Sequence, residues 1–165
     1  MAMIAVLRQG PDDAAVLDLM VRAADYCLLE KGRPPIAADV PAFFASCVPG
    51  GDLAEAVKLG FWQDEVLLGV LEMSYGYPDP ADAYIGLLML EKAARGAGIG
   101  PQLLAEATVR ARAKGAKRQL VAVLVANPKG RAFWQREGFR PERDFPASPD
   151  DPLGHARCRM TRDLR

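Results

Sequence analysis

The chain has 165 residues, half of them hydrophobic and a quarter charged, which is typical of one globular domain and excludes a low-complexity or disordered polypeptide. Its 21 basic and 21 acidic residues cancel, whereas a nucleic-acid-binding domain usually carries a net positive charge. No apolar stretch approaches the roughly 18 residues of a membrane span, and residues 2–7 are too short for a secretion signal. We expect one cytoplasmic domain over residues 1–165, with neither a nucleic-acid nor a membrane partner.

The first half of the chain alternates apolar runs with breakers. Gly10-Pro11 is suited to open a helix, and the run 31–35 to end it. Two strand-like runs joined by three polar residues predict an antiparallel hairpin. The expected elements are a strand over 3–8, a helix from Gly10 to Lys31, a helix over 38–47, and strands over 54–62 and 66–75.

The second half of the chain begins with a loop over 76–80, because two prolines in three residues suit neither a helix nor a central strand. The unbroken apolar run 120–126 predicts a strand buried on both faces. The expected elements are a strand over 84–90, a helix from Ile99 to near Gly115, the strand 120–126, a helix from Asn127-Pro128 to Glu137, a strand opening at Phe139, a loop over 146–152 and a last strand over 155–161. This order predicts a mixed α/β sheet flanked by helices.

Charge and cysteine content add two expectations. Residues 1–90 hold 5 basic against 13 acidic residues, and residues 91–165 hold 16 against 8. The summed field of a basic half favours a phosphorylated ligand, and that of an acidic half favours a cationic one. The three cysteines lack the spacing of metal ligands or of a small disulfide framework. We therefore expect no metal and read Cys27, within a helical pattern, as a packed thiol rather than a nucleophile.

The segment Arg95-Gly96-Ala97-Gly98-Ile99-Gly100 lies between a predicted buried strand and a predicted helix. Glycines let several backbone N–H groups turn toward one point, and the start of a helix adds the positive end of its dipole. A phosphate or diphosphate is favoured there, with the Arg95 cation beside it. A tight connection that merely needs small residues is the simpler alternative.

Two other nucleotide motifs fit this segment poorly. A dinucleotide fingerprint needs a glycine three residues after Gly98, where Pro101 stands. A P-loop needs Gly-Lys-Ser/Thr, which the sequence lacks. NAD and ATP are therefore disfavoured as ligands.

These residues together resemble the GCN5-related N-acetyltransferase (GNAT) superfamily. The family's cofactor motif, Gln/Arg-x-x-Gly-x-Gly/Ala, is matched by Arg95, Gly98 and Gly100. A second family element, an Asn, an aromatic residue seven positions on and then Gly-Phe, is matched by Asn127, Trp134 and Gly138-Phe139. The two elements occur in the family's order, and the likeness is specific from about residue 67 to 140.

The resemblance implies a GNAT-like fold and acetyl-CoA as the acyl donor, without a metal. In this family two parallel strands splay apart and the pantetheine arm lies in the gap; Leu88 and Leu90 occupy the first strand here. The diphosphate would lie on the amides of the glycine-rich turn, and Asn127 would bond the pantetheine while also capping the next helix. The implied cofactor-binding residues are Leu88, Leu90, Arg95, Gly96, Ala97, Gly98, Gly100, Asn127 and Trp134.

Trp134 is a departure from the family pattern. Many relatives carry a tyrosine there, whose hydroxyl can protonate the departing thiolate. An indole N–H is a donor but not a useful acid, so we expect slower turnover rather than none. A core position for Trp134 is compatible with cofactor contact.

The expected reaction is direct attack of an amine on the thioester. An alkylamine is mostly protonated at pH 7, so a base must take its proton. Glu72 and Asp82 are the candidates on the central strands, and either is alternatively an ordinary exposed strand residue. Aromatic and acidic residues suit a cationic amine, and we expect the acceptor pocket to include Tyr26, Glu30, Tyr75 and Tyr77.

Three hypotheses remain open at this point. The first is an N-acetyltransferase acting on a small-molecule or peptide amine, and the second is a catalytically idle acyl-CoA sensor of the same fold. The third is a nucleotide-binding module. Homodimers are common among relatives, and the sequence leaves this question open too.

Overall fold

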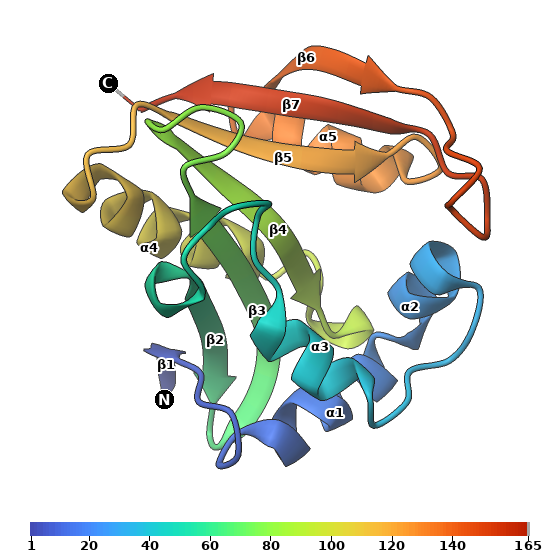
Figure 1. The fold of residues 1–165 in the computed structure, drawn as a ribbon. Helices are drawn as coiled ribbons and strands as arrows, with labels where there is room; N and C mark the ends of the chain where they lie inside the picture. Colours follow the sequence, from blue (N-terminus) through green and yellow to red (C-terminus); the bar gives the residue numbers. More distant parts are fainter. Residues whose placement is uncertain (165) are drawn as a thin grey trace.

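A seven-stranded sheet forms the centre of the molecule, with helices on both faces (Figure 1). The computed structural model describes residues 1–164. The strands lie in the order β1-β2-β3-β4-β5-β7-β6, and every neighbouring pair is antiparallel except β4 and β5, which are parallel. The strands are β1 (Ala2–Val6), β2 (Val57–Gln63), β3 (Val66–Tyr75), β4 (Asp82–Leu90), β5 (Arg118–Leu124), β6 (Arg140–Phe145) and β7 (Arg157–Asp163). The predicted mixed sheet is confirmed.

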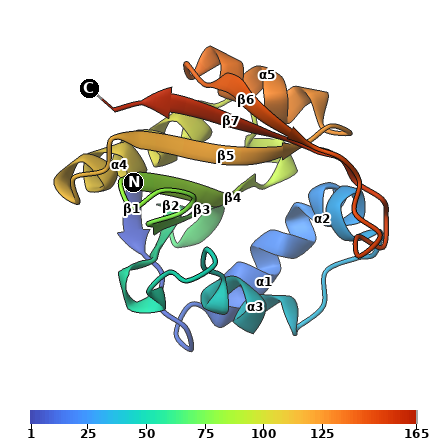
Figure 2. The same ribbon diagram turned by 45° about the horizontal axis from the view of Figure 1, so that its top comes forward.

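The helices cover the sheet in two layers. They are α1 (Asp13–Arg22), α2 (Ala24–Lys31), α3 (Asp39–Ala45), α4 (Ile99–Ala113) and α5 (Pro128–Arg136), with short 3-10 turns η1 (Leu53–Glu55) and η2 (Lys92–Ala94). One core cluster packs α4 and α5 against one face, and a second packs α1 and α3 against the other (Figures 1 and 2). Figure 2 also shows α2 beside the loop between β6 and β7. There His155 Nε2 lies 2.7 Å from the carbonyl oxygen of Leu29.

The prediction of one helix from Gly10 to Lys31 is wrong, because the chain leaves helical geometry at Ala23 (φ −112°, ψ 29°). The N–H of Ala23 still bonds the carbonyl oxygens of Leu19 and Met20. Ala23 itself is fully buried. No glycine or proline marks the break, so it follows from how the two helices pack rather than from local propensity.

The bounds of most predicted strands differ from the structure by about two residues, as β1 and β4 do, and three differences go further or have an identifiable reason. The run 54–62 begins as the turn η1, since the Asp52 carboxylate accepts a bond from the Ala54 N–H at 2.9 Å. The last strand lies two residues later than predicted, at Arg157–Asp163. In β5, Ala122 is exposed although burial on both faces was expected. On the side away from α5, β5 is therefore open to solvent at Ala122 only locally, since Leu120 and Leu124 on the same side are buried.

No helix within residues 1–164 is long and apolar enough to cross a membrane. In the same described part of the chain, no three His, Cys, Asp or Glu side chains are grouped as metal ligands.

Candidate active site

The parallel strands β4 and β5 are paired over only part of their length. Asp82–Ile85 of β4 faces Arg118–Val121 of β5, and beyond Ile85 the two strands diverge (Figure 1). The other edge of β4 stays paired with β3 as far as Leu90. The edge of residues 86–90 toward β5 therefore presents backbone N–H and C=O groups without a strand partner. Leu88 and Leu90 lie on this segment, where the sequence predicted a cofactor contact.

The glycine-rich turn leads from the end of β4 into α4. Gly96 and Gly98 have φ of +83° and +82°, a left-handed conformation that glycine adopts without strain. Gly98 is the N-cap residue of α4, and no side chain within residues 1–164 accepts a hydrogen bond from the N–H groups of Ile99 and Gly100 in the first turn. Gly96, Ala97 and Gly98 are exposed. The helix start therefore lacks a side-chain cap and follows three exposed residues, which suits an anion.

Gly100 has a second role. It is buried, and a Cβ at this position would lie 3.2 Å from the Phe133 ring. Its lack of a side chain thus lets the first turn of α4 approach α5 closely. Phe133, which the sequence analysis did not single out, is the aromatic residue nearest this turn.

The Arg95 side chain is already paired with protein groups. Its guanidinium bonds both carboxylate oxygens of Asp25 on α2 at 2.6 and 2.9 Å, and the carbonyl oxygen of Leu90 at 3.1 and 3.3 Å. The hydrogen bond from Arg95 lowers the pKa of Asp25. Arg95 therefore joins the end of β4 and the turn to α2, and its charge is offset before any ligand arrives.

Asn127 and Trp134 belong to the second predicted element. The Asn127 Oδ1 accepts a bond from the Gly130 N–H at 3.0 Å, which makes it the N-cap of α5 at the end of β5. Trp134 is buried and packs edge-to-face between Phe133 and Phe139, both at 5.0 Å between ring centroids. The structure thus places Trp134 in the core under the sheet.

Glu72 lies in a pocket of about 220 Å³ on the α3 side of the sheet. The carboxylate is almost fully buried and next to Gly86 of β4, where a Cβ would come within 1.8 Å of Glu72 Oε2. Ser74 donates a hydrogen bond to Glu72 Oε1 at 2.8 Å. The pocket is lined by Ser46, Cys47, Val48, Pro49, Glu72, Tyr77, Tyr84 and Gly86.

The pocket meets the divergence of the parallel strands at Gly86. The register of β3 against β4 shifts here, because Glu72 faces Leu87 while Met73 faces Ile85. Gly86 is therefore the extra residue of a β-bulge, a feature common beside active sites. It also directly follows Ile85, the last residue of β4 that pairs with β5. The carboxylate of Glu72 thus lies at the point where the sheet opens.

Asp82, the other candidate base, lies in a different environment. Arg118 bonds both of its oxygens, at 2.9 and 2.7 Å, and the Asp79 N–H adds a third bond at 3.2 Å. The hydrogen bond to Asp82 raises the pKa of Arg118 above its already high value. Both oxygens of Asp82 are occupied, so we retain Glu72 alone as the candidate base.

The four residues expected around the acceptor are not all brought together. Tyr77 lines the pocket with Glu72. Tyr75 instead packs in the core on the α4 side, with Lys114 Nζ 5.8 Å from its ring, because alternate strand residues point to opposite faces. Tyr26 and Glu30 lie together on α2 and do not line the pocket. Burial raises the pKa of Tyr26, and the charge of the neighbouring Glu30 raises it further.

Sequence reasoning missed Lys58, Ser74, Tyr84 and Gly86 around Glu72. Lys58 is the direct cross-strand partner of Glu72, and Tyr84 is the partner of Ser74. The pairing of Lys58 with Glu72 could not be predicted by counting residues back from the hairpin turn. The bulge at Phe61/Trp62 shifts the register of β2 against β3 by one residue. Gly86 carried no signal, since a single glycine in an apolar run has many explanations.

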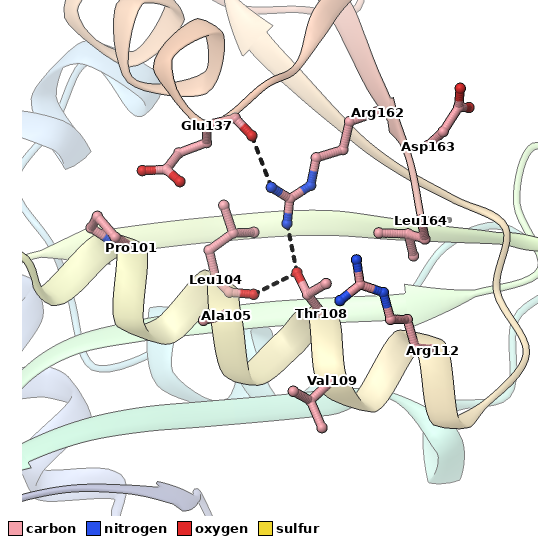
Figure 3. A pocket seen from close by; sticks show the side chains of 10 residues that line it. All are labelled: Pro101, Leu104, Ala105, Thr108, Val109, Arg112, Glu137, Arg162, Asp163 and Leu164. Atoms are coloured by element: carbon pink, nitrogen blue, oxygen red, sulfur yellow. Dashed lines mark hydrogen bonds between the residues drawn. The ribbon is translucent and has the colours of Figure 1, made fainter.

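A larger hollow of about 380 Å³ lies along the outer side of α4 (Figure 3). Figure 3 shows Arg162 of β7 donating to the Glu137 carbonyl at 2.8 Å and to the Thr108 hydroxyl at 2.6 Å. Thr108 in turn donates to the Leu104 carbonyl at 2.8 Å. These bonds join α4, β7 and the end of α5, on the sheet face opposite Glu72.

Comparison with known proteins places this geometry in a family. The family model described as the acetyltransferase (GNAT) family matches residues 35–139, which include the pocket, the diverging strands and the glycine-rich turn. The chain belongs to this family. Among curated proteins, the sequence has no significant match.

Solved structures of GNAT proteins share the fold over nearly the whole chain. An acetyltransferase from Thermus thermophilus has a TM-score of 0.79 at 22% identity, with 99% of this chain and 97% of that chain covered. An N-acetyltransferase from Staphylococcus aureus has a TM-score of 0.76 at 20% identity, with 100% and 99% covered. The PaiA N-acetyltransferase of Thermoplasma acidophilum, in complex with coenzyme A, has a TM-score of 0.68 at 16% identity, with 99% of both chains covered.

Proposed function

We propose that this GNAT protein transfers an acyl group, with acetyl as the expected one, from acyl-CoA directly to an amine, and that Glu72 is the general base. One observation carries the proposal: a buried carboxylate lies beside the bulge at Gly86, where β4 separates from β5. A base is needed at a reacting centre, and the open strand edge is where the family's cofactor arm is expected to lie.

The chain's own residues fit coenzyme A. The exposed amides of Gly96, Ala97 and Gly98 and the uncapped start of α4 would hold the diphosphate. The unpaired edge of residues 86–90 would bond the amide groups of the pantetheine arm. When bound, acyl-CoA supplies the thioester; the protein supplies orientation and proton transfer.

Glu72 would remove the proton of the attacking amine through Oε2. An alkylamine is largely protonated at neutral pH, so a carboxylate at the reacting centre both attracts the cation and accepts its proton. Tyr77 and Tyr84, whose rings are 5.7 Å apart, would form the aromatic side of the acceptor pocket. The acceptor is expected to be a small-molecule or peptide amine.

The buried position of Trp134 supports a second candidate, a catalytically idle acyl-CoA sensor. Trp134 occupies the position at which many relatives have a tyrosine acid, and an indole cannot replace that acid. Such a protein would bind coenzyme A and release no thiol.

Two measurements separate the candidates. Coenzyme A at about 100 times its Kd should stabilise the fold by about 2.7 kcal/mol, which corresponds to a Tm increase of roughly 5–10 °C for a chain of this length. NAD and ATP should not do so. A thiol-release screen of acetyl-CoA against an amine panel should then show turnover that Glu72→Gln reduces by about 10² to 10⁴ fold. Binding without thiol release from any amine would support the sensor instead.

A further inference from the structure

The two carboxylate oxygens of Glu72 have different surroundings. Oε1 accepts the hydrogen bond of Ser74 at 2.8 Å and lies 3.5 Å from Lys58 Nζ. Oε2 has no bonding partner among residues 1–164 and lies over Gly86, the residue that leaves room for it. Both charged or polar neighbours therefore act on one oxygen, and the other faces the pocket.

Lys58 is held in place by its own contacts. Its side chain is almost fully buried, its Nζ donates a hydrogen bond to the Ser46 carbonyl oxygen, and the ammonium lies 5.5 Å from the centroid of the Phe43 ring. Burial lowers the pKa of Lys58, and the carboxylate of Glu72 opposes this effect. Lys58 also connects Glu72 to the segment 46–49, which forms one wall of the pocket.

A carboxylate this buried is costly to keep ionised without a partner. An ammonium within about 4 Å offsets that cost, and the hydroxyl of Ser74 adds a donor on the same side. A base also needs one oxygen free for its proton. The arrangement around Glu72 meets both needs, because every donor is on Oε1.

We propose that Lys58 is a positioning residue for Glu72: together with Ser74 it fixes Oε1, keeps the buried carboxylate charged, and leaves Oε2 free for the amine. This inference rests on the proposed function, in which Glu72 is the base. Lys58 itself does not touch the reacting atoms.

The other titratable groups at the pocket do not duplicate this role. They are the thiol of Cys47 on the 46–49 wall and the phenols of Tyr77 and Tyr84. Burial raises the pKa of Tyr84, so its phenol stays neutral in the range where a carboxylate base operates. No second ammonium or guanidinium is within salt-bridge distance of Glu72 in the described chain.

The test compares Lys58→Met and Ser74→Ala with the unchanged protein. Removing the ammonium makes ionisation of Glu72 less favourable, so the acid limb of the pH profile of kcat/KM should move upward by about one pH unit or more in Lys58→Met. We expect kcat at pH 7 to fall several-fold, by at most tenfold for each pH unit of that shift, and the KM for acetyl-CoA to change less than twofold. Ser74→Ala, which removes one hydroxyl and preserves the fold more surely, should lower kcat several-fold in the same pattern.

Lys114→Met is the matched control. Lys114 pairs with Glu55 on the opposite side of the sheet, and its loss should leave the pH profile unchanged. If Lys58→Met and Ser74→Ala reduce activity without moving the acid limb, while Tm and coenzyme A binding are retained, Lys58 does not act on Glu72 and the proposal is overturned.

A second readout does not depend on activity. In protein labelled with ¹³C at glutamate carboxyls, the Glu72 signal is assigned by its absence in Glu72→Gln and titrated by NMR. Its midpoint should be higher in Lys58→Met than in the unchanged protein. An unmoved midpoint refutes the role of Lys58, whereas a moved midpoint in a protein that releases no thiol with any amine refutes only the proposed function.

Discussion

At the scale of single residues, the site depends on the close approach of Glu72 and Gly86. These residues lie on adjacent strands, and Gly86 is the bulge residue that has no partner on β3. A Cβ at Gly86 would overlap Glu72 Oε2, at 1.8 Å. The carboxylate can occupy its position only because this residue has no side chain. The bulge and the glycine therefore both make room for the Glu72 carboxylate beside β4.

Gly86→Ala should remove activity without preventing cofactor binding. The added methyl group must displace the Glu72 carboxylate, so we expect kcat to fall at least tenfold while the Kd for coenzyme A, measured by calorimetry, changes less than threefold. The same substitution in a Glu72→Gln background should cost little more, because residues in contact are not additive. Full additivity of the two substitutions would contradict this explanation.

The sequence predicted residue roles unevenly. Glu72 could be selected because alternation separates it from Leu71 and Met73, and the same rule should have removed Tyr75 from the list, since it lies three positions along the same strand. Asp82 could not be distinguished from Glu72, because its partner Arg118 is distant in sequence. The residue pattern of one sequence does not show which residues far apart in the chain pair with each other.

At the scale of elements, Arg95 connects three parts of the fold. Its guanidinium bonds Asp25 of α2 and the carbonyl oxygen at the end of β4, while its backbone opens the turn into α4. The turn is therefore held in place before a ligand binds, which reduces the ordering cost of binding. The sequence analysis singled out Arg95 as a cofactor contact, but it did not predict the protein groups that bind its guanidinium.

Replacing Arg95 by alanine should weaken coenzyme A binding several-fold, because the turn loses its attachment. Arg95→Lys should not restore it, since one ammonium cannot reproduce a two-pronged bond to Asp25 together with a bond to Leu90. Isothermal calorimetry measures both, with Arg136→Ala, an exposed arginine on α5, as the control. Recovery of affinity in the lysine variant would show that only the positive charge matters.

Element order was more predictable than element boundaries. Clear sequence signals mark the hairpin of β2 and β3, the glycine-rich turn and the long helix α4, and all three are present. The break between α1 and α2 has no such signal, because it is imposed by packing around the buried Ala23. The partial separation of β4 from β5 was inferred from the family resemblance rather than from the residues.

At the scale of the whole molecule, a network of charged side chains links the strands at the end where β4 and β5 are still paired. Arg118 bonds Asp82 of β4 and Glu142 of β6, and Arg159 of β7 bonds Glu142 at 2.8 Å. Four strands are thus linked on one face. Burial disfavours the ionised form of Glu142, but its bonds to Arg118 and Arg159 outweigh this and lower its pKa.

Arg118→Met should reduce the unfolding free energy at pH 7 by about 3 kcal/mol, because it leaves the buried Asp82 without its counter-charge. Glu142, whose pKa the hydrogen bond from Arg118 helps to lower, stabilises the fold above the usual glutamate pKa of roughly 4.3, and this effect is lost as the pH falls through the lowered value. The difference between variant and unchanged protein should therefore shrink below about pH 4. Urea unfolding at pH 7 and below pH 4 measures this difference in unfolding free energy. The control is Arg140→Met, which removes an exposed ion pair with Asp163 and should cost less than about 1 kcal/mol.

The gap between β4 and β5 has a further consequence for how two reactants could meet. Helix α4 and the carboxylate of Glu72 lie on opposite sides of one sheet, and β4 and β5 are unpaired between them beyond Ile85. A thioester carrier approaching from one side and an amine approaching from the other would not compete for an entrance. The part of the amine that is remote from the reacting nitrogen would then stay outside the pocket. The size of this part would be limited by the rim of the acceptor pocket and not by the distance between β4 and β5.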